Sequence, residues 1–254
     1  MTPSLQFPHR RIATATVVGR GRLGRPLARA LHAAGVMVTG PLGRGDDVAP
    51  ADVVLLCVPD AEIARVAATV PHGGSLIGHL SGATPLSESG ADFGLHPLQS
   101  FTGDEGSDTF RGIGCAVAGR SPEALAVPRE LAVRLGGRPF EVSDSQRAGY
   151  HAAASVASNF IVTLLAAAEQ LAAASGLAAA DARMLLAPLV RTTVANWAEL
   201  GPESALTGPI ARGDVRTVER QRRAVAEDTP ELLGLFDALC ASTRALAAKG
   251  RAAA

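Results

Sequence analysis

A run with three glycines, Gly19-Arg20-Gly21-Arg22-Leu23-Gly24, constrains this chain more than any other segment. It follows an apolar, β-branched run, residues 12–18, and opens a stretch with helical periodicity, residues 22–34. In that setting the first glycine permits a tight turn, the second lets the backbone approach a pyrophosphate, and the third allows close packing of the helix. The free N–H groups at the helix start then face an anion. We therefore predict a dinucleotide-binding loop; the alternative is a plain glycine turn between strand and helix.

The chain divides into two regions that differ in their expected secondary structure. Residues 1–145 alternate apolar runs with helical stretches, with strands expected over 12–18, 36–39, 53–58, 75–80, 94–95 and 115–118, and helices over 22–34, 60–69 (capped by Asp60) and 122–135. Continuous apolar strands alternating with helices are typical of a parallel sheet covered on both faces. Residues 146–254 are helical, with helices expected over 146–175, 181–200, 215–227 and 230–248. We predict an α/β Rossmann domain with a mostly parallel sheet, followed by an all-α domain for substrate binding and dimerisation.

Composition excludes several classes of function. The chain has 24 basic and 24 acidic residues, and this zero net charge argues against nucleic acid as a partner. Lys249 is the only lysine, so no lysine is available in the middle of the chain as a catalytic acid or a phosphate clamp. Three separated cysteines and six histidines show no metal-ligand spacing, and no metal is predicted.

The nature of the dinucleotide depends on the end of the second expected strand. NAD-binding proteins place an acid there to hold the ribose hydroxyls, but residues 36–39 are followed by Gly40 and Pro41. Arg20, Arg22 and Arg44 are expected instead to pair with a 2′-phosphate, which favours NADP(H) over NAD(H). Two alternatives stay open: these arginines are ordinary solvated residues, or the strand ends later and brings Asp46 and Asp47 into range.

Six segments together resemble a known group of bacterial proteins. They are Leu55-Leu56-Cys57-Val58-Pro59-Asp60, His79-Leu80-Ser81-Gly82-Ala83, Gly94-Leu95-His96-Pro97-Leu98-Gln99-Ser100-Phe101, Tyr150-His151-Ala152-Ala153-Ala154, Ser158-Asn159-Phe160, and Leu206-Thr207-Gly208-Pro209 with Arg212-Gly213-Asp214. This set is similar to the Rossmann-like and DUF2520 domain-containing proteins, near the β-hydroxyacid and 6-phosphogluconate dehydrogenase superfamily. The resemblance covers most of the chain. It implies a 6-phosphogluconate-dehydrogenase-like fold, a helical domain that often dimerises, and NADP-dependent oxidoreductase activity. It does not imply a substrate, for which ketopantoate is one candidate.

The chain departs from the wider superfamily at one position. Many β-hydroxyacid dehydrogenases carry a catalytic lysine one turn before an asparagine on the first helix of the C-terminal domain. The asparagine is similar in position to Asn159, but one turn earlier this chain has Ser155. The superfamily mechanism therefore does not transfer unchanged. A non-catalytic NADP(H)-binding sensor or assembly subunit is the main alternative to an enzyme, and an enzyme using a deazaflavin partner is neither supported nor refuted.

A line of polar residues on one helix supplies the first candidates for chemistry. His151, Ser155 and Asn159 recur at i, i+4 and i+8, which places them on one face of the helix expected over 146–175. Histidine suits general acid chemistry, so His151 is the expected proton donor, with Asn159 holding the substrate oxygen and Ser155 assisting. The alternatives are a histidine that bonds to backbone or packs beside Tyr150, and an asparagine that bonds to a neighbouring helix.

His96 is the second catalytic candidate. The segment Gly94-Leu95-His96-Pro97 is similar to one in prephenate dehydrogenases whose histidine contacts substrate, and it is expected at the carboxyl end of a strand, where α/β sheets bind ligands. The alternative is a turn histidine that precedes a proline. Ser81 and Gly82 also follow an expected strand and are expected to line the substrate pocket, whereas His79 is expected in the core.

The remaining candidates come from two loops. Thr207 and Arg212 are expected to bind substrate, Arg212 by bidentate pairing with a carboxylate, while Asp214 either binds substrate or caps the next helix. The resemblance places Val58 and Pro59 beside the cofactor. The full expected cofactor set is Gly19, Arg20, Gly21, Arg22, Leu23, Gly24, Arg44, Val58 and Pro59.

Together these features predict an NADP(H)-dependent oxidoreductase that reduces a small carbonyl substrate, such as a 2-keto acid, or an imine, in a cleft between the two domains. We expect a cytoplasmic homodimer joined through the helical domain. The first residues lack the pattern of a signal peptide. We also expect no membrane span, because no uncharged apolar stretch is expected to reach the ~18–20 residues that a span needs.

Overall fold

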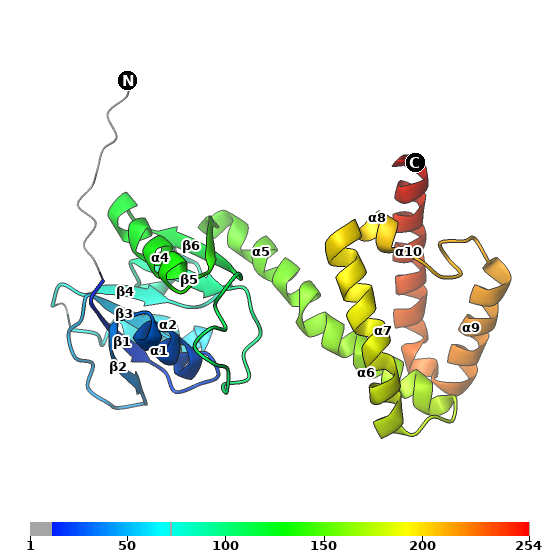
Figure 1. Ribbon diagram of the computed structural model, residues 1–254, viewed down its shortest axis with the longest axis horizontal. Helices are drawn as coiled ribbons and strands as arrows, with labels where there is room; N and C mark the ends of the chain where they lie inside the picture. The colour runs from blue at the N-terminus through cyan, green and yellow to red at the C-terminus, as the bar shows by residue number, and fades with distance from the viewer. Residues whose placement is uncertain (1–11, 72, 254) are drawn as a thin grey trace. The chain divides into compact units, whose positions relative to one another are not determined.

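The computed structural model describes residues 12–71 and 73–253, and it divides into two compact units, Met1–Ser158 and Asn159–Ala254 (Figure 1). The division lies 13 residues after the boundary expected at residue 145, since the first helix after that boundary groups with the sheet. The expectation about a signal peptide concerns residues outside the described part of the chain.

A seven-stranded sheet forms the centre of the first unit, with strand order β2-β1-β3-β4-β5-β6-β7 (Figure 1). Every pair of neighbouring strands is parallel except β5 and β6, so the prediction of a mostly parallel sheet is confirmed. The strands are β1 (Thr14–Val18), β2 (Met37–Leu42), β3 (Val53–Leu56), β4 (Leu76–His79), β5 (Phe93–Pro97), β6 (Gly114–Gly119) and β7 (Arg138–Glu141).

Helices cover both faces of this sheet. On one face Val53 and Leu55 pack with Leu27 of α1 and Leu131 of α4, and on the other Val54 and Leu56 pack with residues of α2 and α3. All four residues of β3 are buried, as expected for a strand with a helix layer on each side. The helical segments of the first unit are α1 (Gly24–Ala33), the 3₁₀ turn η1 (Asp60–Glu62), α2 (Ile63–Ala67), α3 (Leu86–Ser89), α4 (Pro122–Arg134) and α5 (Asp144–Ala157).

Two local predictions in the first unit are wrong. Strand β2 continues to Leu42, three residues beyond its expected end, because its ladder with β1 extends to the pair Val18 and Leu42. Asp60 does not cap the helix after β3. It is the first residue of η1, whose N-cap is Pro59 and which has no side-chain cap.

The strand β7 is absent from the expected elements. Its sequence, Arg-Pro-Phe-Glu, suits an edge strand.

The long helix expected over 146–175 is broken at Ser158. Ser158 has φ −129° and ψ −77°, and its N–H bonds to the carbonyl of Ser155 at 3.4 Å, not to the residue four positions back. The expected face shared by His151, Ser155 and Asn159 therefore holds only for the first two, which lie on α5, while Asn159 begins the next helix.

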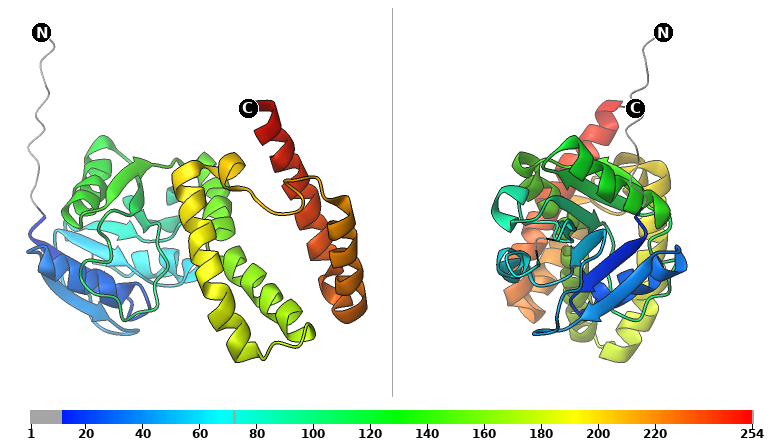
Figure 2. Two further views of the ribbon diagram at one scale, coloured as in Figure 1. Left: turned by 45° about the vertical axis from the view of Figure 1, so that its right-hand side comes forward. Right: turned by 90° about the vertical axis from the view of Figure 1, so that its left-hand side faces the viewer.

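The second unit consists of helices and connecting loops, with no strand among its described residues (Figure 2). Its segments are α6 (Asn159–Ala174), α7 (Ala179–Leu200), α8 (Pro202–Ala205), α9 (Val215–Asp228), the 3₁₀ turn η2 (Pro230–Leu232) and α10 (Leu233–Ala253). Helix α6 packs along α7, and α9 packs along α10 (Figure 2). Pro188 lies inside α7 without ending it.

The expectation that no apolar stretch is long enough to span a membrane is also wrong. The run Asp144–Ala174 is long and apolar enough to do so by length and composition alone. The break at Ser158 divides this run into α5 and α6.

Candidate functional site

The glycine loop joins β1 to α1 and has the geometry that its sequence predicts. Gly19 has φ +120°, and a Cβ there would lie 2.2 Å from the carbonyl oxygen of Cys57. A Cβ on Gly24 would lie 1.9 Å from the carbonyl oxygen of Gly19, so the third glycine permits the helix start to close against the loop. A Cβ on Gly21 would meet no atom within 4 Å, so the second glycine faces open space. The N-cap residue, Leu23, has an apolar side chain that cannot accept a hydrogen bond, so no side chain caps the helix start and its N–H groups can face an anion.

The loop forms one wall of a pocket of about 960 Å³ in the first unit. The pocket lies at the carboxyl ends of β1, β2 and β3, where the strand order reverses about β1. Open α/β sheets bind ligands at this switch point. The lining residues are Val18, Gly19, Arg20, Gly21, Leu42, Gly43, Arg44, Gly45, Asp46, Asp47, Val48, Val58, Pro59, Glu62, Arg65, Val66, Thr69 and Pro71.

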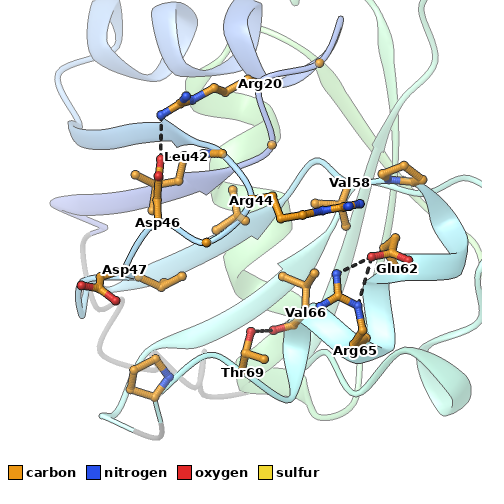
Figure 3. A pocket seen from close by; sticks show the side chains of 18 residues that line it. Arg20, Leu42, Arg44, Asp46, Asp47, Val58, Glu62, Arg65, Val66 and Thr69 are labelled. Atoms are coloured by element: carbon orange, nitrogen blue, oxygen red, sulfur yellow. Dashed lines mark hydrogen bonds and ion pairs between the residues drawn. The ribbon is translucent and has the colours of Figure 1, made fainter.

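An acid does lie in this pocket, contrary to the expectation drawn from a short second strand. Because β2 ends at Leu42, Asp46 reaches the pocket rim (Figure 3). Its Oδ2 accepts hydrogen bonds from Nη2 of Arg20 at 2.6 Å and from the N–H of Gly43 at 2.8 Å. The carboxylate is therefore already paired with a cation.

Two further arginines line the pocket. Arg44 extends across it toward Val58, and Arg65 of α2 is paired with Glu62, with Nε 3.0 Å from Oε2 (Figure 3). The bond to Arg65, with Arg44 adding to it, lowers the pKa of Glu62. Arg65 is a pocket residue that the sequence analysis missed; the only signal was its i+3 spacing from Glu62 after a strand end.

Not all of the expected cofactor residues line this pocket. Gly19, Arg20, Gly21, Arg44, Val58 and Pro59 do so. Arg22 is exposed beside Gly103, and Leu23 packs against the hydrophobic core. Gly24 acts through the loop backbone, as described above.

A second cluster gathers at the carboxyl ends of β4 and β5 under α5. His96 Nδ1 lies 2.6 Å from the hydroxyl of Tyr150, and the rings of His96 and His151 meet edge to face with centroids 6.2 Å apart. A Cβ on Gly82 would lie 2.7 Å from Nδ1 of His151 and 2.9 Å from Nε2 of His96. The absence of a side chain at Gly82 is what lets both imidazoles approach the loop after β4.

Helix α5 is anchored to the same loop by a buried arginine. Arg147 is 2% exposed, and its Nη1 donates to the carbonyl of Ser81 at 3.2 Å, with Nε 3.8 Å from Oδ1 of Asp144. Asp144 in turn accepts from the N–H groups of Leu86 and Ser87. These contacts fix the start of α5, and with it Tyr150 and His151 one turn later. Nothing in the sequence separates Arg147 from a surface arginine.

Burial keeps the histidines of β4 and β5 neutral. Desolvation, with the nearby His151 and Arg147 acting in the same direction, lowers the pKa of His96 to about 4. Desolvation and Arg147 lower the pKa of His79 to about 4 as well. His79 is fully buried, as expected for a core residue, and its Nδ1 accepts from the N–H of Ser81 at 3.2 Å.

The structure brings together His96, His151, Ser81 and Gly82 in the first unit, with Ser155 one turn after His151. The Ser81 hydroxyl accepts from the N–H groups of Ala83 and Thr84, which shapes the turn. Asn159 is exposed on the second unit, as is Thr207.

Arg212 and Asp214 lie in a separate pocket of about 460 Å³ within the second unit, together with Arg244 and Arg251. Asp214 accepts a hydrogen bond from the N–H of Thr217 and so caps α9, which is one of the two roles expected for it. Among residues 12–71 and 73–253 no group of three or more His, Cys, Asp or Glu is arranged to hold a metal ion.

Solved structures share this architecture. A provisionally named NADP oxidoreductase from Bacteroides fragilis is 24% identical with TM-score 0.75, over 92% of this chain and 98% of the other. A Thermotoga maritima protein is also 24% identical with TM-score 0.75, over 94% and 99%. A reductive aminase from Aspergillus terreus, in complex with NADPH and ethyl-5-oxohexanoate, is 17% identical with TM-score 0.59, over 92% and 95%. At these identities the likeness concerns the fold.

Comparison with curated proteins finds no match. A family model described as a domain of unknown function, DUF2520, matches residues 113–243, which is more than half of the 254 residues. This match confirms the resemblance that the sequence motifs carry. The chain therefore belongs to the DUF2520 family.

Proposed function

We propose that this protein is an NADP(H)-dependent oxidoreductase that reduces a small carbonyl compound or an imine. The observation that carries the proposal is the pocket at the switch point of the sheet. At this pocket Gly21 faces open space next to a helix start that no side chain caps, and Arg44 and Arg65 line the same pocket. The names of the Bacteroides fragilis protein and of the Aspergillus terreus reductive aminase support the same class of cofactor.

The pocket residues divide into two roles. The N–H groups of the glycine loop hold the pyrophosphate, and Gly21 leaves room for its close approach. Arg44 and Arg65 hold the 2′-phosphate, because guanidinium groups pair with phosphate oxygens bidentately. Asp46 is paired with Arg20, so it competes weakly for the ribose hydroxyls that an NAD-binding acid would hold.

The second cluster supplies the groups that meet the substrate. When bound, the cofactor supplies the hydride that adds to the substrate carbon. The oxygen or nitrogen of the reduced bond must then gain a proton. We assign His151 as the proton donor and His96 as the group that hydrogen-bonds the same atom, since both imidazoles converge beside Gly82. The proton that His151 transfers is replaced from solvent.

The two imidazoles also bear on the class of substrate. A small 2-keto acid such as ketopantoate, or an imine, fits a site with two imidazoles. We propose Ser81, Gly82 and Ser155 as neighbours of the substrate in the first unit. Asn159, Thr207, Arg212 and Asp214 remain candidates from the second unit.

A calorimetric titration with NADPH and NADH side by side tests the cofactor assignment. We expect the wild type to bind NADPH more tightly, and the double variant Arg44→Ala/Arg65→Ala to lose at least tenfold in NADPH affinity while its NADH affinity changes little. Arg25→Ala, an exposed arginine of α1 outside the pocket, is the matched control. If neither nucleotide binds, the glycine loop is structural and the proposal is abandoned.

A non-catalytic NADP(H)-binding protein is the second candidate. It is favoured by the position of the only lysine, Lys249, on α10 of the second unit, far along the chain from the histidine cluster. A panel of 2-keto acids and imines with NADPH separates the two. Turnover that is lost in His151→Ala supports the enzyme, whereas tight NADPH binding with no turnover across the panel supports the sensor.

A further inference from the structure

We propose that Tyr150 is a positioning residue that fixes the tautomer of His96. Its hydroxyl donates to Nδ1 of His96, so the ring keeps its hydrogen on Nε2, which faces Gly82 and His151. This inference rests on the proposed function, in which His96 and His151 meet the carbonyl or imine group of the substrate.

The hydrogen bond itself indicates which group donates. Nδ1 of His96 and the hydroxyl oxygen of Tyr150 are 2.6 Å apart. That distance falls in the range of O–H donors and is shorter than the usual N–H···O distance of about 2.9–3.0 Å. The Tyr150 ring is held in place from two sides, edge-on to His96 at 5.6 Å and edge-on to Phe140 at 5.8 Å between centroids. The hydroxyl is therefore aimed at one atom.

The protonation states of the two groups agree with this direction. Desolvation raises the pKa of Tyr150 to about 12, so its hydroxyl has a hydrogen to donate at neutral pH. The pKa of His96 near 4 means that its ring carries one hydrogen only. In a neutral imidazole the bond made by one nitrogen decides where that hydrogen sits, so an accepting Nδ1 places it on Nε2.

Charged and titratable groups face His96 from three elements. His151 and Arg147 come from α5, and His79 lies on the neighbouring strand β4. Asp60 of η1 acts in the opposite direction and favours a charged ring, but burial outweighs it. The buried guanidinium of Arg147 thus opposes a second proton on His96, and Tyr150 selects the place of the first.

The selected tautomer matters because of what Nε2 faces. Nε2 of His96 and Nδ1 of His151 both lie within 3 Å of the position that a Cβ on Gly82 would occupy. Nδ1 of His151 is buried and has no hydrogen-bond partner among the described residues. A buried polar atom without a partner requires an explanation, and a substrate atom supplies one. With the hydrogen on Nε2, His96 donates to that atom; with the hydrogen on Nδ1, it could only accept.

The test is the ¹⁵N spectrum of the histidine side chains in the full-length protein at pH 7, with His96 assigned by His96→Gln. We expect a hydrogen on Nε2 and none on Nδ1 in the wild type, and a mixture of both tautomers in Tyr150→Phe. Ser145→Ala, which removes a hydroxyl from an exposed position of the same helix, should leave the His96 signals unchanged. A wild-type ring with its hydrogen on Nδ1, or a Tyr150→Phe spectrum equal to wild type, would overturn the proposal. If Tyr150→Phe does not fold, the wild-type spectrum decides alone.

Kinetics give a second readout on any substrate that the panel identifies. We expect Tyr150→Phe to lower kcat at least tenfold with an unchanged affinity for NADPH, because the cofactor pocket does not include Tyr150. The predicted tautomer in a protein that reduces nothing would refute the proposed function and leave this inference intact. An active enzyme in which His96 carries its hydrogen on Nδ1 would support the proposed function and refute this inference.

Discussion

Gly21 and Gly24 belong to one motif, but a side chain at each would have a different effect: at Gly24 on the stability of the folded protein, at Gly21 on nucleotide binding. A Cβ on Gly24 would overlap the carbonyl oxygen of Gly19 at 1.9 Å, so Gly24→Ala strains the folded protein itself. We expect it to lower the free energy of unfolding by about 1–3 kcal/mol, the usual range for an overpacked site. Urea unfolding of the wild type and the variant measures this loss.

Gly21→Ala is the complementary variant of the same loop. Since a Cβ there meets no atom within 4 Å, we expect stability to change by no more than about 0.5 kcal/mol. The same methyl group occupies the space that a pyrophosphate needs, so NADPH affinity should fall at least tenfold in calorimetry. Unchanged affinity would show that no dinucleotide approaches the loop at Gly21.

His79 makes the folded protein sensitive to acid. Its pKa is lowered to about 4 by burial, whereas an unfolded histidine titrates near 6.5. Stability is therefore unaffected above about pH 6.5 and falls as the pH drops toward 4, because the unfolded chain binds a proton that folded His79 refuses. The loss from this residue is at most about 3 kcal/mol.

The variant His79→Asn isolates that effect, since its amide oxygen can still accept from the N–H of Ser81. We expect its unfolding free energy to decline less between pH 6.5 and 4 than that of the wild type. His32→Asn, at an exposed position of α1, is the matched control. His96 contributes in the same direction in all three proteins, so it does not alter the comparison. Parallel pH profiles for His79→Asn and the wild type would contradict the assignment.

At the scale of elements, α5 depends on one buried side chain. Arg147 donates to the carbonyl of Ser81 and lies near Asp144, which keeps its own partners at Leu86 and Ser87. Arg147→Met keeps much of the volume but leaves that carbonyl without its donor, and we expect a loss of about 1–3 kcal/mol. The control Arg129→Met breaks an exposed pair with Glu141 and should cost no more than about 1 kcal/mol. Equal losses in urea unfolding would show that Arg147 does not anchor α5.

Elements with strong local signals could be predicted from the sequence. The buried run around Val53–Leu56 and helix α4, with Ser121 as its cap and Pro122 in its first turn, agree with expectation within a few residues. The break at Ser158 was not predicted, because apolar and alanine-rich sequence continues on both sides and only Ser158 and Asn159, residue types that favour caps and turns, mark the position. Strand β7 was missed because its stability comes from pairing with β6, which no local pattern shows.

The candidate site divides in the same way. The glycine loop could be predicted from the sequence, because the spacing of its glycines matches the backbone geometry that each of them permits. The contacts of the histidines could not be predicted, because they depend on which strands lie side by side under α5. Arg147 and Tyr150 each resemble an ordinary helix residue until the sheet order brings β4 and β5 together.

At the scale of the whole molecule, the second unit has too few buried apolar side chains for its length. Those buried among its described residues are Ala182, Val218, Val225, Cys240 and Ala247, and α6 contributes none. Large apolar side chains of α6 and α7 are exposed instead: Phe160, Val162, Met184, Leu185, Leu189, Val194, Trp197 and Leu200. So many exposed large apolar side chains on two helices indicate a surface that is covered by a partner.

We propose a second copy of this chain as that cover, joined through α6 and α7. The surface carries few charges, which suits the more apolar character of homodimer interfaces. Sedimentation should give a dimer for the wild type and a monomer for Phe160→Glu, because a carboxylate cannot be buried unpaired without a large cost. Val133→Glu, at a position that is at least as exposed but lies on α4 of the first unit, should remain dimeric. Circular dichroism checks that each variant is folded. A monomeric wild type, or a wild type that sediments with lipid vesicles through the apolar run Asp144–Ala174, would overturn the dimer.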